Sequence, residues 1–70
     1  MKYEVGTEVE IFVCVWSSLD IQLELDYHPE AVGDTKTFKG KISDIVDEWN
    51  VKVRIGRKKY DISVEELTLI

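Results

Sequence analysis

Residues 9–15 read VEIFVCV, with an aliphatic residue at every second position. Because successive side chains of a β-strand point to opposite faces, this spacing predicts a strand over residues 7–16 with one aliphatic face. The alternation returns in residues 19–25 (LDIQLEL), 51–55 (VKVRI) and 60–64 (YDISV). Together the four stretches predict a small all-β domain.

Size and composition favour a binding role over catalysis. The 70 residues predict one domain, residues 1–70, and so short a chain buries only about 60% of the surface that its unfolded form exposes. No activated nucleophile or acid–base pair stands out, so we expect a non-enzymatic protein without cofactor or metal. Cys14 lies between two valines and is interpreted as a small core side chain, while His28 has no second ligand at a useful spacing.

The chain carries an uneven charge and no membrane signal. Its net charge is −5, and residues 1–35 hold one basic residue against eight acidic ones. No stretch has the length of a membrane span or the pattern of a signal peptide, so we expect a cytoplasmic protein that does not contact a membrane. Lysine outnumbers arginine, and alanine and proline occur once each, which is typical of AT-rich sources such as low-GC bacteria or their phages.

The first two alternating stretches predict a hairpin, with residues 7–16 paired to residues 19–27 around Ser17-Ser18. A two-residue loop would place Phe12, Cys14 and Trp16 on the face of the leucines. A three-residue loop would instead gather the aliphatic residues of both strands inside and leave Phe12 and Trp16 outside, among acidic residues. We favour the second register, because it unites the aliphatic core.

The rest of the chain predicts a loop and three further strands. Residues 28–35 are a loop, residues 36–46 a strand that bends at Gly40, residues 49–55 and 59–64 a hairpin, and residues 64–67 one helical turn before a closing strand at residues 68–70. Pairing Ile55 with Tyr60 brings Val53 opposite Ile62. Trp49 and Tyr60 match the inward phase of their strands, which predicts core positions for both.

This order resembles the SH3-like small barrels, among them the Tudor and KOW modules. The likeness is carried by residues 5–11 (VGTEVEI), 39–42 (KGKI) and 60–67 (YDISVEEL) as a pattern of strand types. It implies a five- to six-stranded SH3-like barrel with one short helical turn before the last strand. An OB-fold barrel is the structural alternative, but residues 43–49 are too short for the helix that it inserts there. Tudor modules hold methylated side chains in an aromatic cage, for which this chain offers Tyr27, Phe38, Trp49 and Tyr60 without an identifying spacing.

The favoured function is protein–protein interaction through an exposed apolar and acidic surface. Its predicted contact residues are Phe12, Trp16, Asp20, Gln22, Glu24 and Asp26. One alternative is a nucleic-acid-associated module that uses the basic residues of the late hairpin, namely Lys52, Arg54, Arg57, Lys58 and Lys59. Another is a small acidic phage or mobile-element inhibitor whose carboxylates imitate the phosphates of nucleic acid. Asp44, Asp47 and Glu48 are interpreted as a turn, because they lack the regular oxygen ladder of a calcium loop.

Overall fold

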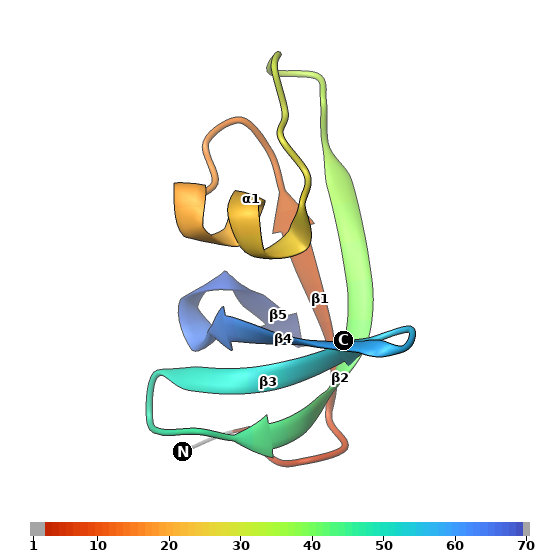
Figure 1. Ribbon diagram of the computed structural model, residues 1–70, viewed down its shortest axis with the longest axis vertical. Coiled ribbons are helices and arrows are strands. Elements are labelled where there is room, and N and C mark those ends of the chain that lie inside the picture. The colour runs from red at the N-terminus through yellow and green to blue at the C-terminus, as the bar shows by residue number, and fades with distance from the viewer. Residues whose placement is uncertain (1–2, 70) are drawn as a thin grey trace.

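The computed structural model describes residues 3–69 of the chain and consists mainly of strands (Figure 1). Its elements are, in order, β1 (Glu8–Val13), α1 (Leu19–Leu25), β2 (Lys36–Ile45), β3 (Asn50–Ile55), β4 (Lys58–Ser63), the 3-10 turn η1 (Val64–Glu66) and β5 (Leu67–Leu69). The strands form one antiparallel sheet in the order β4-β3-β2-β1-β5. Within residues 3–69 the two end strands, β4 and β5, do not pair with each other, so the expected closed barrel is not formed there.

Strand β1 lies inside the sheet and confirms the first predicted strand in part. Val9, Ile11 and Val13 are fully buried, as the alternation predicts. The strand ends at Val13 instead of residue 16 because a turn begins at Cys14. The backbone N–H of Cys14 donates to the Ser17 hydroxyl at 3.0 Å, and the Ser17 N–H donates back to the Cys14 carbonyl at 3.0 Å.

The second predicted strand is wrong, because residues 19–25 form the helix α1. Ser18 caps its N-terminus by accepting a hydrogen bond from the Ile21 N–H, and Asp26 ends it in the left-handed conformation with φ 51°. The predicted hairpin is therefore absent in either register. Strand β1 pairs instead with β2 on one side and β5 on the other.

The helix divides its four alternating apolar residues into two pairs. In a helix, residues four apart share a face, whereas residues two apart lie on opposite faces. Ile21 and Leu25 are buried and join the core, while Leu19 and Leu23 are exposed. Figure 1 shows α1 lying above β4 and η1.

Strand β2 confirms the predicted strand after the loop and crosses the molecule from β1 to β3. Gly40 allows its closest approach to β3, because a Cβ atom there would lie 2.5 Å from the Arg54 carbonyl oxygen. The register with β3 shifts between Ile42 and Asp44, which leaves Ser43 as a bulge. The Ser43 hydroxyl lies 3.3 Å from the Lys52 carbonyl oxygen across this bulge.

The late hairpin is confirmed, but its predicted register is wrong by two residues. Ile55 pairs with Lys58, Val53 with Tyr60 and Val51 with Ile62. The turn is shorter than expected because Gly56 adopts φ 64°, which permits a tight two-residue connection with Arg57. A shift of two leaves every side chain on its predicted face. Val51, Val53 and Ile62 are accordingly buried.

The chain ends with the helical turn and short strand that the sequence predicts. The turn η1 is capped by the Ser63 hydroxyl, and β5 pairs Leu67 with Ile11 and Leu69 with Val9. The predicted closing strand included Ile70, which lies outside the described residues. One hydrophobic cluster joins the strands and the helix, consisting of Val9, Ile11, Val13, Ile21, Leu25, Ile42, Val51, Val53, Ile62 and Leu67.

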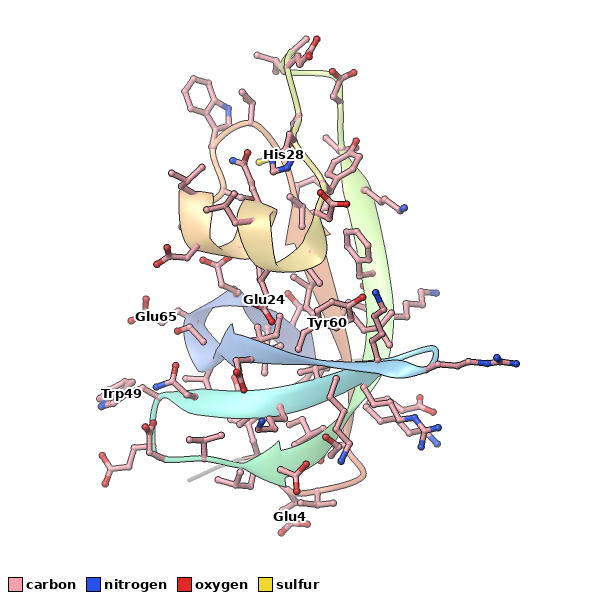
Figure 2. All side chains as sticks on the ribbon, in the orientation of Figure 1. Glu4, Glu24, His28, Trp49, Tyr60 and Glu65 are labelled. Carbon is pink, nitrogen blue, oxygen red and sulfur yellow. The ribbon has the colours of Figure 1, made fainter. Side chains whose placement is uncertain are left out.

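The phase of Trp49 in the sequence predicts a core position, and this prediction is wrong. Strand β3 begins one residue later, at Asn50, so Trp49 lies in the turn between β2 and β3 with an exposed side chain. Figure 2 shows it at the edge of the molecule. Tyr60 is partly buried and packs against the core.

Candidate protein-binding surface

Three large apolar side chains are exposed at and just before α1. Trp16 is 81% exposed in the turn before the helix, and Leu19 and Leu23 are 66% and 60% exposed on the helix itself. Leu19 and Leu23 are four residues apart and so lie next to each other along one face. We call these three residues the apolar strip. Single exposed leucines are ordinary, but a tryptophan and two leucines on one short segment are typical of an interaction surface.

Beside the apolar strip, carboxylates line a groove of about 580 Å³ between α1, β4 and η1. This acidic groove is lined by Ser18, Asp20, Ile21, Leu23, Glu24, Asp61, Ser63, Glu65 and Glu66. Figure 2 shows Glu24 reaching from α1 toward β4, with Glu65 on the neighbouring turn. Leu23 belongs to both surfaces, so the strip and the groove are continuous.

Several groove residues hold α1 in place. The Glu24 carboxylate accepts a hydrogen bond from the Asp61 backbone N–H on β4 at 3.2 Å. The Ser18 hydroxyl donates to Glu66 Oε1 at 3.3 Å. The Asp61 carboxylate lies 3.5 Å from the Lys52 ammonium. The side-chain carboxylates of Asp20 and Glu65 have no hydrogen-bond or ion-pair partner within residues 3–69, and both residues are exposed.

The acidic strand that the sequence predicted does not form, because its residues are helical. Asp20 and Glu24 lie together in the groove, whereas Gln22 and Asp26 lie elsewhere on α1. The Gln22 amide donates to the Ser17 carbonyl at 2.9 Å, and Asp26 caps the helix 3.5 Å from His28. The carboxylates therefore do not form a row at the spacing of a strand. The predicted imitation of nucleic-acid phosphates depended on that row.

Phe12 lies apart from the helix, on the face of β1 that points away from the core. It is 52% exposed and stands opposite Thr37 of β2. Phe12 and Trp16 are thus both exposed, but they lie on different elements. The structure does not join them to the predicted acidic residues in one strand-based patch.

The basic residues of the late hairpin lie in two places, on the outer face of the sheet and at the tip of the hairpin. On the outer face of the sheet, Arg54 stands between Lys41 and Lys59, and we call these three residues the basic row. Lys59 lies 3.2 Å from Asp44, and Lys52 is paired with Asp61. Hydrogen bonds from the Ser43 hydroxyl and from Lys59 hold the pKa of Asp44 below its usual value.

Arg57 and Lys58 lie at the tip of the same hairpin, which projects away from α1 (Figure 1). Both side chains are exposed, and within the described part of the chain neither has an acidic partner. Two of the five predicted nucleic-acid contacts are therefore occupied by carboxylates of the same sheet. The remaining cations are Arg54, Arg57 and Lys58.

The aromatic residues do not gather into a single cage. The rings of Tyr27 and Phe38 meet edge to face with their centroids 6.3 Å apart, and the Lys36 ammonium lies 4.8 Å from the centroid of Phe38. Trp49 stands in the distant β2–β3 turn, next to Asp47 and Asn50. Its own backbone N–H donates to Asp47 Oδ1 at 2.8 Å.

Asp47 organises this turn and gives it a pH dependence. Hydrogen bonds from the backbone N–H of Trp49 and from Asn50 lower the pKa of Asp47. A carboxyl whose pKa is lower in the folded state stabilises the fold above its unfolded pKa, and this stabilisation is lost as the pH falls through the folded value. We therefore expect Asp47→Asn to reduce the loss of stability on acidification, measured as the urea midpoint at about pH 6 and about pH 2.

The matched control for Asp47 is Glu48→Gln, which removes a neighbouring carboxylate that has no hydrogen-bond partner among the described residues. This variant should keep the acid sensitivity of the unmodified protein. Equal acid sensitivity in Asp47→Asn and the unmodified protein would contradict the assigned role.

No group of three or more potential ligands within residues 3–69 could hold a metal ion. Cys14 is partly buried beside Ser17, and His28 is exposed. Within the same residues, no helix has the length and apolar character needed to span a membrane.

Sequence reasoning missed Leu19, Leu23 and the groove residues Asp61, Glu65 and Glu66. The spacing of Leu19 and Leu23 and the serine before them are compatible with a capped helix, but the alternation of apolar residues predicts a strand and a turn there. The groove itself depends on the position of α1 against β4, which no local signal specifies. Comparison of the chain with family models, curated proteins and solved structures gives no match.

Proposed function

We propose that this protein is a non-enzymatic module that binds another protein through the apolar strip. The observation that carries the proposal is the exposure of Trp16, Leu19 and Leu23 beside a core that already contains Ile21 and Leu25. These side chains do not contribute to folding by burial, so their contact with water is relieved only by a partner. Tryptophan is also the residue type most enriched among side chains that dominate binding energy.

The strand arrangement also supports an SH3-like architecture as part of this proposal. The tight β3–β4 hairpin and the 3-10 turn before β5 are two of the features that carry the resemblance. The open sheet and the helix after β1 depart from the barrel that we expected. The proposed binding surface lies on the departing element, α1, and so does not depend on the resemblance.

A direct test compares the binding of Trp16→Ala and Leu23→Ala with that of the unmodified protein. The partner is first captured from cells of the source organism after nuclease treatment, purified, and titrated against each variant. Because a central aromatic anchor contributes about 2 kcal/mol or more, Trp16→Ala should weaken binding by about 30-fold. Leu23→Ala should weaken it by about 10-fold.

Val32→Ala is the matched control, because Val32 is an equally exposed aliphatic residue in the loop between α1 and β2. It should bind as the unmodified protein does. All three variants should retain the same urea midpoint, since the substituted side chains are exposed. Unchanged affinity of both strip variants would overturn the proposed surface.

A second candidate function is association with nucleic acid through the hairpin tip. It is favoured by the exposed cations Arg54, Arg57 and Lys58, which have no carboxylate partner within residues 3–69. Its test is binding of a labelled DNA or RNA duplex by the triple variant Arg57→Ala, Lys58→Ala and Lys59→Ala. A nucleic-acid module should show steep salt dependence and a loss of affinity in this variant, whereas no duplex binding at low salt would remove this candidate.

A further inference from the structure

The apolar strip and the acidic groove run side by side along α1. Leu19 and Leu23 form one row of the helix, and Asp20 and Glu24 form the next, each with a spacing of four residues. Four residues of helix rise about 6 Å, so both rows have the same repeat. A partner with parallel apolar and charged rows at this repeat would match both at once, and such rows occur on an amphipathic helix.

The negative charge of the groove determines the sign of the charge that a partner must carry. Five carboxylates line it, from Asp20, Glu24, Asp61, Glu65 and Glu66, and within the described residues Lys52 is the one cation paired with any of them. The cations of the basic row and the hairpin tip do not line the groove. An acidic partner would be repelled here, and two copies of this chain related by a twofold axis through α1 would bring like charges together.

We infer that the partner docks on α1 with a basic amphipathic helix, whose apolar row packs on the apolar strip and whose lysine or arginine row faces the acidic groove. This inference rests on the proposed function and adds the chemistry of the partner. Leu23 lines both surfaces and marks the line along which the two rows of the partner meet. The carboxylates of Asp20 and Glu65 are available for ion pairs, because neither carboxylate has a partner within residues 3–69.

The test uses a synthetic leucine–lysine amphipathic helix of about 14 residues, labelled for fluorescence anisotropy. A leucine–glutamate peptide of the same pattern is the probe of opposite charge. The full chain should bind the lysine peptide at about 0.05 M salt, and this affinity should fall markedly at about 0.3 M. The glutamate peptide should not bind at either salt concentration. Equal binding of both peptides, or binding of neither, would overturn the inference.

Charge-neutral variants locate the contact. The double variant Asp20→Asn and Glu65→Gln should bind the lysine peptide about tenfold more weakly, because it removes two ion pairs at the surface. The double variant Glu4→Gln and Glu30→Gln makes the same change in net charge with exposed carboxylates that do not line the groove. It should change the affinity by less than about twofold, and an equal loss in both double variants would show general attraction instead of docking in the groove.

The variants of the apolar strip, Trp16→Ala and Leu23→Ala, distinguish failure of this inference from failure of the proposed function on which it rests. Suppose that Trp16→Ala and Leu23→Ala weaken binding of the captured partner, but the double variant Asp20→Asn and Glu65→Gln does not. The apolar surface is then supported, and the basic helix is wrong. If neither set changes that binding, both proposals fail. Sedimentation of the unmodified protein gives a further outcome, because self-association lost in Trp16→Ala would make a second copy the occupant.

Discussion

Ile21→Ala is expected to lower the free energy of unfolding by about 3 kcal/mol, whereas Leu23→Ala should change it by less than about 0.5 kcal/mol. Ile21 is 4% exposed and belongs to the core cluster, so its truncation leaves a cavity under α1. Leu23 is 60% exposed on the same helix and is not part of the core cluster, so its truncation leaves no buried cavity. Alanine is a good helix former, so neither substitution disturbs α1 through its backbone.

This pair of variants discriminates between the helix and the strand that the alternation predicts. In a strand, residues 21 and 23 share a face, and the two substitutions would have similar effects. In the helix they lie on opposite faces, and the effects differ severalfold. Urea unfolding of both variants measures the difference, and equal destabilisation would contradict the helix.

Gly40→Ala is the second substitution with a large expected effect, a loss of about 3 kcal/mol. The new Cβ would lie 2.5 Å from the backbone oxygen of Arg54 and less than 3 Å from the side chains of Val53 and Ile55. A backbone atom in a paired strand cannot move without breaking the β2–β3 ladder. The clash therefore separates the two strands at the centre of the sheet.

Gly33→Ala is the matched control for the β2 glycine. An added Cβ at Gly33 meets no atom within 4 Å, so this loop variant should be as stable as the unmodified protein. If Gly40→Ala unfolds at the same urea concentration as Gly33→Ala, the close approach of β2 to β3 is wrong.

The sequence predicts the sheet well wherever alternation and turn chemistry agree. Val9, Ile11 and Val13 are buried as expected, and the late hairpin keeps its faces although its register moves by two residues. The helix α1 could not be distinguished from a strand by period alone, because apolar residues at every second position are also pairs four apart. Two features favour the helix over the strand. Ser18 caps the helix, and β1 cannot pair with residues 19–25 because β2 and β5 already occupy its two sides.

The binding surface was predictable only in part for the same reason. Trp16 was expected to be exposed from its phase in the first strand, and it is. Leu19 and Leu23 were assigned to the core, because a strand would have buried them together with Ile21. Glu65 enters the groove only because η1 lies next to α1, although α1 ends at Leu25 and η1 begins at Val64.

The hydrogen bond from the Asp61 N–H to Glu24 has a consequence for solubility. Strand β4 forms one border of the open sheet, and an uncovered border can recruit a strand from another molecule and begin aggregation. The Glu24 carboxylate occupies one donor of this border, and the charged side chains of Lys58 and Lys59 repel a second strand beside it. The helix thus shields this border from intermolecular sheet growth, while Leu19 and Leu23 stay exposed on it.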